Sequence, residues 1–159
     1  MKIFPSSIYE FSLIDDQNET IERLNRRTEN SDNLISKITN KSFIGKIDKN
    51  KFKIISSDIG KGAFCTLNGQ INNKIGEVVV EINKPFKILF SILMLFPIVR
   101  FIIQLTLRVE EFNPIFIIVI LAQILILRFV FIEIAYKFLS KQSINKLSDV
   151  LDTEYIRKK

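Results

Sequence analysis

Polar side chains interrupt an otherwise apolar part of this 159-residue chain, and they are the first candidates for chemistry. Arg100, Gln104 and Arg108 recur every four residues, so a helix would place them along one face. A guanidinium among hydrocarbon side chains needs a partner, a route to water or a function. We predict that Arg100 turns toward the following apolar stretch, donates to the side-chain carbonyl of Gln123 and directs its remaining donors toward the membrane surface. The sharper alternative is a carboxylate inside the membrane helix of a partner protein.

A second polar pair lies at the end of the apolar region. Arg128 and Glu133 are five residues apart, and Lys137 follows. We predict an interfacial ion pair between Arg128 and Glu133, with Lys137 as the other possible partner of this glutamate.

Residues for catalysis are scarce. The chain has no histidine, which removes the commonest general base and metal ligand. Cys65 is the one cysteine, so no internal disulfide can form. Its alternation with apolar neighbours predicts a buried side chain. We therefore predict no catalytic, cofactor-binding or metal-binding residue, and no enzymatic activity.

Other polar groups have structural explanations. Glu77 and Glu81 would lie about 13 Å apart on one face of a strand, which predicts solvated side chains. The glycines at 58–62, in "DIGKG", lack the spacing of a phosphate-binding loop and predict a connection between strands. Asp15 and Asp16 precede a helical pattern, and Asp16 with Glu19 has the spacing of a capping box.

The element that must position Arg100 is a membrane hairpin. Residues 88–107 and 114–131 are each about as long as a helix needs to cross a hydrocarbon core, and neither has a polar face. Runs of this length exceed ordinary strands. We predict spans at about 86–107 and 114–133 with an outer loop at 108–113. A buried soluble core is the alternative, and the charges at Arg100 and Arg128 favour it.

The distribution of Lys and Arg predicts the orientation. Three lysines lie within residues 70–87 and three within 132–150, whereas the loop carries only Arg108 beside two glutamates. The positive-inside rule then places both termini in the cytoplasm. The abundance of Ile, Lys, Asn and Phe, whose codons are A+T-rich, indicates a bacterial genome, and so the inner membrane. The net charge of +6 is spread over both polar regions, which argues against nucleic acid as a partner and for a lipid bilayer.

The polar flanks predict an α+β module. Residues 8–13 read as a strand, 16–29 as a helix, 31–41 as a short second helix, and 42–82 as an antiparallel meander of four strands. Residues 143–152 form an amphipathic pattern with Ile144, Leu147, Val150 and Leu151 on one face. We predict a cytoplasmic module at 1–84, the hairpin at 85–136, and a tail helix at 137–159 that packs on the module.

The meander followed by a hairpin resembles a group of small bacterial two-span membrane proteins. Their pattern is F-x-G-x-I, a Phe-Lys-Ile strand, G-x-I, two transmembrane helices, an F-x-x-E junction and a Leu-rich tail helix. The matching positions are Phe43, Gly45, Ile47, Phe52, Lys53, Ile54, Gly69, Ile71, Phe131 (or Phe129) and Glu133. The match covers about 42–151, but residues 58–66 depart from it, since the group tends to have an aromatic segment with Arg and Pro there. The resemblance implies the architecture and carries no assigned activity.

Two functions follow as expectations. The first is a non-catalytic membrane protein that acts as an interaction module: a subunit, a regulator or an immunity-type partner of another membrane protein. The second is a lipid or hydrophobe binder, because the order of elements also resembles the helix-grip folds that hold lipids. A filled core between sheet and helices favours the first, and an apolar pocket there favours the second. The sequence predicts no oligomeric state.

Overall fold

The computed structural model describes residues 3–107 and 115–159 and separates the chain into two units. Met1–Asn83 and Tyr136–Lys159 form one unit, and Lys84–Ala135 form the other. We name them the sheet unit and the hairpin unit. The predicted outer loop at 108–113, with Arg108, lies outside the described residues.

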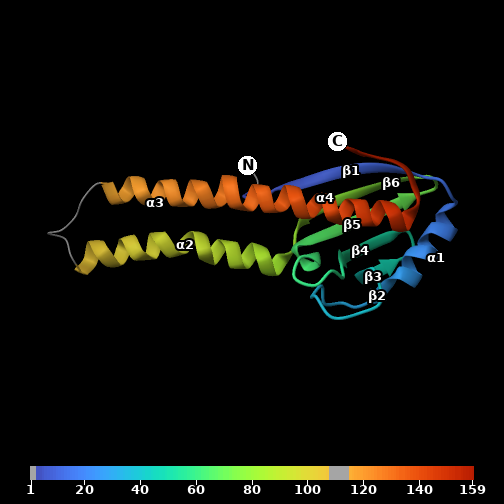
Figure 1. Ribbon diagram of the computed structural model, residues 1–159, viewed down its shortest axis with the longest axis horizontal. Coiled ribbons are helices and arrows are strands. Elements are labelled where there is room, and N and C mark those ends of the chain that lie inside the picture. The colour runs from blue at the N-terminus through green and yellow to red at the C-terminus, as the bar shows by residue number, and fades with distance from the viewer. Residues whose placement is uncertain (1–2, 108–114) are drawn as a thin grey trace. The chain divides into compact units, whose positions relative to one another are not determined.

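A seven-stranded mixed sheet builds the sheet unit (Figure 1). Its spatial order is β2-β3-β4-β5-β6-β1-β7. The strands are β1 (Ser6–Leu13), β2 (Thr28–Asn30), β3 (Phe43–Asp48), β4 (Lys51–Ser56), β5 (Cys65–Asn72), β6 (Ile75–Ile82) and β7 (Thr153–Lys158). Strands β3 to β6 form the predicted antiparallel meander, and β1 pairs antiparallel with β6. The α+β class is confirmed.

Both edge strands depart from the sequence prediction. β2 pairs parallel with β3, so the sheet is mixed and not purely antiparallel. The chain does not end in a helix, because α4 (Ile132–Leu151) stops at Asp152, whose φ of 54° reverses the chain direction. Residues after Asp152 add β7 to the free edge of β1, where Ile156 pairs with the buried Phe11. A strand on this edge satisfies backbone groups of β1 that a longer helix would leave unpaired.

The predicted helix at 31–41 is absent, and this segment is irregular. Short polar side chains bond to nearby backbone instead: the Ser31 hydroxyl accepts from the Asn33 amide at 3.2 Å, and the Thr39 hydroxyl accepts from the Lys41 amide at 3.2 Å. Such local bonds compete with helix formation. The Asn83 side chain also donates to the carbonyl of Leu34 at 2.9 Å, which holds the segment without a helical turn.

Helix α1 (Gln17–Arg27) forms as predicted, but without the capping box. Asp16 occupies the N-cap position and makes no capping side-chain bond. Asp15 instead binds Arg23, and Glu19 lies 3.9 Å from the same guanidinium. Arg23 thus pairs with Asp15 and Glu19, whereas Asp16 stays at the N-cap position.

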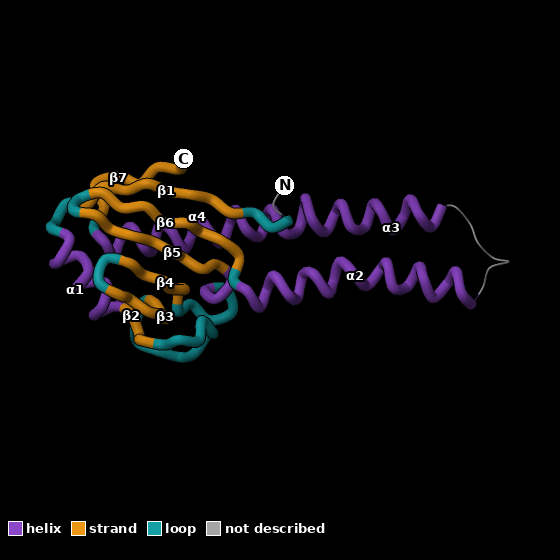
Figure 2. The backbone as a smooth tube through the Cα atoms, turned by 180° about the vertical axis from the view of Figure 1, so that it is seen from behind, coloured by secondary structure: helices purple, strands orange, loops and turns teal. Residues whose placement is uncertain are grey.

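The core lies between the sheet and helix α4, which crosses one face of the sheet (Figures 1 and 2). Alternate strand residues point to this face, as the predicted period of two requires. Their side chains are 0–4 % exposed at Phe11, Leu13, Phe43, Phe52, Ile54, Cys65, Leu67, Ile71, Val78, Val80 and Ile82. From α4, Ile144, Leu147 and Leu151 are 0–4 % exposed.

Close strand packing depends on Gly69. This glycine pairs directly with Phe52 across β5 and β4. A Cβ atom at position 69 would lie 2.1 Å from Cζ of Phe52, so the phenyl ring occupies the space that any side chain would need. The ring covers backbone that a glycine otherwise leaves bare, so Phe52 and Gly69 fit each other across the two strands.

Two polar contacts attach α4 to the sheet. The buried Tyr136 hydroxyl donates to the Val80 carbonyl at 2.9 Å. Further along the helix, the Lys146 ammonium donates to Asp58 at 2.8 Å and to the Ser56 hydroxyl at 3.1 Å. The hydrogen bond from Lys146 lowers the pKa of Asp58. These contacts fix the rotation of α4, so that its apolar face meets the sheet.

The hairpin unit consists of α2 (Lys84–Leu107), α3 (Ile115–Leu125) and η3, a π-helical segment (Ile126–Phe131) that continues into α4. Lys84–Gln104, 21 residues, and the helical run Ile115–Leu151, 37 residues, are each long and apolar enough to cross a membrane. Only 6 % of the most apolar window of each is buried. The core helix of a soluble protein would be mostly buried, so this exposure favours contact with lipid.

Replacing Leu147 by Ala tests the sheet–helix core. Leu147 is fully buried, and truncation of such a leucine costs about 2–5 kcal/mol of unfolding free energy. We expect Leu147→Ala to lower the denaturant midpoint of the sheet unit, measured by protease resistance of the full chain in detergent. Asn145→Ala, an exposed position on the same helix, is the matched control and should leave the midpoint within error. Equal midpoints for both variants would mean that α4 does not contribute to this core.

Candidate functional site

An apolar groove between α2 and α3 is the candidate site of the hairpin unit. It encloses about 550 Å³. The lining residues are Leu93, Phe96 and Pro97 from α2, and Val119, Ala122, Gln123, Ile124, Ile126, Leu127 and Phe131 from α3 and η3. Gln123 is the one polar side chain of this lining.

The groove contains a backbone carbonyl and a side-chain amide, and neither can form a hydrogen bond with hydrocarbon. Pro97 lies inside α2 and has no N–H, so the carbonyl of Leu93 loses its ordinary partner within the helix. Both residues line the groove, opposite the amide of Gln123. A membrane helix tolerates such a proline when a neighbouring helix or a polar side chain re-satisfies the freed backbone group.

Arg100 continues the groove-lining face of α2. It lies four residues after Phe96, three after Pro97 and seven after Leu93, spacings that share one side of a helix. Gln104 follows one turn later. The Arg100 side chain is exposed, and within residues 3–107 and 115–159 no hydrogen bond connects it to Gln123. The predicted contact between the two in a bilayer therefore stays a prediction.

Arg100 and Gln123 nevertheless lie at similar depths in the hairpin. Arg100 is seven residues before the end of α2 at Leu107, about 10 Å of helix. Gln123 is eight residues after the start of α3 at Ile115, about 12 Å. Antiparallel helices connected by a short segment thus bring both side chains to about the same level.

The second predicted pair is present. Nη1 of Arg128 lies 3.7 Å from Oε2 of Glu133, and the arginine side chain is 16 % exposed. The same Nη1 atom is buried and has no hydrogen-bond partner among the described residues. Arg128 belongs to η3, and π-helical turns are frequent at functional sites. The carboxylate of Glu133 partly neutralises the charge of Arg128. Because 3.7 Å is longer than a hydrogen bond, this contact is an ion pair only.

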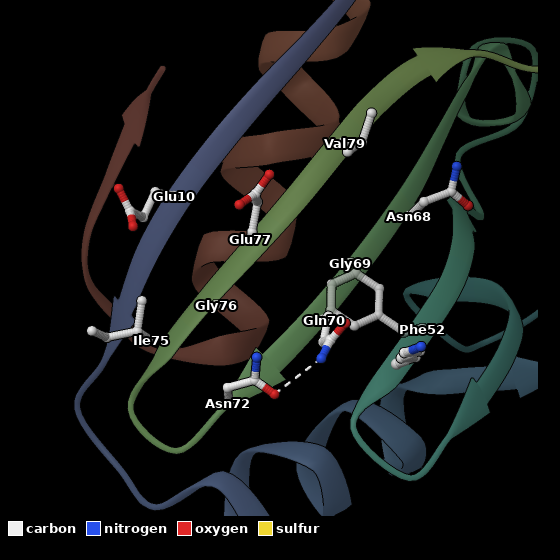
Figure 3. A pocket seen from close by; sticks show the side chains of 11 residues that line it. Glu10, Phe52, Asn68, Gly69, Gln70, Asn72, Ile75, Gly76, Glu77 and Val79 are labelled. Atoms are coloured by element: carbon white, nitrogen blue, oxygen red, sulfur yellow. Dashed lines mark hydrogen bonds between the residues drawn. The ribbon is translucent and has the colours of Figure 1, made fainter.

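A second hollow lies on the face of the sheet opposite α4 (Figure 3). It encloses about 630 Å³ and is lined mostly by polar side chains. In Figure 3 the carboxylates of Glu10 and Glu77 stand on this face, and a hydrogen bond of 3.1 Å connects Gln70 to Asn72. Amides on β5 therefore separate the lysines of β4 from the carboxylates of β6 and β1.

The carboxylates in this hollow are already paired. Glu10 and Glu77 are directly opposite each other in β1 and β6, an arrangement that repels. The Lys159 ammonium lies 3.1 Å from Glu77 and 3.9 Å from Glu10 and offsets this repulsion. Glu81 accepts a hydrogen bond of 3.0 Å from Asn68. These contacts give the carboxylates structural roles on the open face.

Cys65 lies where the sequence places it. The thiol is fully buried in the sheet unit, and burial raises its pKa to about 12. A thiol held neutral is a poor nucleophile. The loop at 58–62 also lies between strands as predicted, and Asp58 in it binds Lys146. Residues 3–107 and 115–159 contain no group of three Cys, Asp or Glu side chains that could hold a metal ion.

Sequence reasoning missed the groove and the role of Lys159. The signal for the groove was the spacing of Leu93, Phe96 and Pro97, which places a helix-breaking residue on the same face as Arg100. The signal for Lys159 was the alternation in "TEYIRKK", which is typical of a strand and was included in the predicted tail helix.

Comparison with protein-family models, with curated proteins and with solved structures gives no match to this chain. The resemblance to small bacterial two-span proteins therefore stays a prediction. Any proposal of function depends on the geometry of the chain itself.

Burial of Cys65 gives a direct test of the sheet unit. Because the thiol is buried and its pKa is raised, we expect no labelling by a maleimide at pH 7.5 in the folded protein and full labelling in denaturant. A cysteine introduced at the exposed Asn30 of β2 is the matched control and should label at once. Rapid labelling of Cys65 in the folded chain would contradict the burial described above.

Proposed function

We propose that this chain is a non-catalytic integral membrane protein that acts as an interaction module, with the sheet unit and both termini in the cytoplasm. The observation that carries the proposal is the exposure of α2 and α3. Large apolar side chains are exposed on every side of α3, including Ile118 at 66 %, Val119 at 55 % and Leu121 at 55 %. A soluble monomer rarely exposes so much contiguous apolar surface, whereas a helix in a lipid bilayer does.

The filled core of the sheet unit supports an interaction module over a lipid binder. Side chains between the sheet and α4 are buried at Phe11, Leu67 and Leu147, each fully inaccessible. A helix-grip protein needs an apolar pocket of a few hundred Å³ in that place. Of the hollows described in the sheet unit, one lies on the opposite face of the sheet and another lies among the arginines of α1.

Charge supports the orientation. Lys84 and Lys87 begin α2, and Lys137 and Lys141 follow the second span, so both cytoplasmic ends of the proposed hairpin are basic. Basic residues next to a span favour the side that carries anionic lipid headgroups.

Membrane insertion is tested by extraction. We expect the full chain to stay in the membrane pellet after washing at alkaline pH, because α2 and α3 would be buried in hydrocarbon. A peripheral protein held only by basic residues is released under the same conditions. Complete release would contradict the proposed insertion.

Topology is tested by cysteine labelling of intact cells. With Cys65→Ser as background, a membrane-impermeant maleimide should label Asn113→Cys, in the predicted outer loop, from outside the cell. The matched Asn30→Cys variant, on exposed β2, should label only after the cells are opened. The reverse pattern would overturn the cytoplasmic location of the sheet unit.

A further inference from the structure

Arg100 has no counter-ion among the described residues of its hairpin. The described parts of the two spans, residues 88–107 and 115–131, contain two arginines and neither Asp nor Glu. Arg128 lies beside Glu133. Arg100, by contrast, has no hydrogen bond or ion pair with any residue in 3–107 or 115–159. A guanidinium keeps its charge in proteins, so a membrane position for Arg100 requires an external partner or contact with the surface.

The groove gives Arg100 a place to meet a partner. Leu93, Phe96 and Pro97 line the groove, and Arg100 is next on that face of α2. Across the groove, Gln123 contributes an amide at about the same depth. Beside it lies Ala122, whose small side chain permits close approach of another helix. The groove therefore combines apolar walls and one amide. Arg100 is not a lining residue, but its spacing places it on the same face of α2.

The chemistry of the partner follows from this combination. An acyl chain would fill the apolar walls but leave Arg100 without a counter-ion at this depth. A second copy of the chain, related by an axis along the membrane normal, would bring its own Arg100 to the same level, and like charges repel. A carboxylate in a single transmembrane helix satisfies the cation, and its second oxygen can accept from the Gln123 amide.

We propose that the groove between α2 and α3 binds one transmembrane helix of another membrane protein, and that an Asp or Glu in this helix pairs with Arg100 inside the bilayer. The proposal rests on the proposed membrane insertion and specifies the partner of the interaction module. Leu93 and Phe96 pack against the apolar side chains of this helix. Gln123 donates to the same carboxylate.

A model helix tests the proposal. The probe is a synthetic leucine-rich transmembrane peptide, flanked by lysines, with one Glu about 10 Å from the outer surface and a fluorescent acceptor. Otherwise identical peptides carry Gln or Leu at this position. Binding to the donor-labelled full chain is measured by energy transfer in phosphatidylcholine vesicles, after flotation has shown that the chain is inserted. A chain that fails to insert contradicts the proposed function, and the binding measurement concerns only inserted protein.

We expect the Glu peptide to bind about tenfold more tightly than the Leu and Gln peptides. Arg100→Leu should remove this preference and leave insertion intact, because the variant loses a charge that hydrocarbon disfavours. Arg128→Leu is the matched control, since it removes the other span arginine, and should keep the preference. Gln123→Leu should reduce the preference in part.

Four results would overturn the proposal. Equal binding of the Glu and Leu peptides would mean that the groove recognises apolar surface alone. Equal binding of the Glu and Gln peptides would mean that charge is not recognised. A Glu preference that survives Arg100→Leu would assign it to another residue. Energy transfer between two copies of the chain that depends on Arg100 would make a second copy the occupant.

Discussion

The exposed apolar surface of α2 and α3 is the constraint on which the proposed membrane hairpin depends. The apolar residues of α3 are exposed all around the helix, at 55–66 % for Ile118, Val119 and Leu121. The sheet unit buries its own apolar side chains against one another, as Phe11, Leu67 and Leu147 show. Its exposed apolar side chains, such as Ile14, Ile38 and Ile59, come from separate segments of the chain, whereas those of α3 follow one another along a single helix. A lipid bilayer covers such a helix without further protein.

The proposed contact with hydrocarbon would leave a few polar groups of the hairpin without hydrogen-bond or charge partners. In water, an exposed arginine, a glutamine and a proline within a helix need no explanation. In hydrocarbon, Arg100 lacks a counter-ion, Gln123 lacks hydrogen-bond partners, and Pro97 frees the carbonyl of Leu93. These groups lie on one side of the hairpin, at the groove, which leaves the rest of both helices suited to lipid. The proposed recognition of a partner helix thus depends on few residues, which have no hydrogen-bond partner of their own in the described hairpin.

The sequence predicted the regular parts of the fold and failed at the edges of the sheet. Alternation in residues 43–82 predicted the meander because one face of each strand is buried, and the long apolar runs predicted the two helices. β2 is only three residues long and too short for a periodic signal, and β7 follows a helical pattern after a single turn residue, Asp152. At the site, spacing was sufficient for the pair of Arg128 and Glu133, whereas the groove depends on how two helices pack, which periodicity in one helix does not encode.

Collision rates of spin labels in vesicles test the lipid contact of α3 most directly. Labels at Ile118, Val119 and Leu121 cover different sides of this helix, since consecutive residues are about 100° apart. We expect each label to collide often with oxygen, which dissolves in hydrocarbon, and rarely with a polar nickel complex. A label at the exposed Asn145, in the sheet unit, should show the opposite preference. Frequent collisions of all three α3 labels with the nickel complex, or low accessibility to both reagents, would contradict the account.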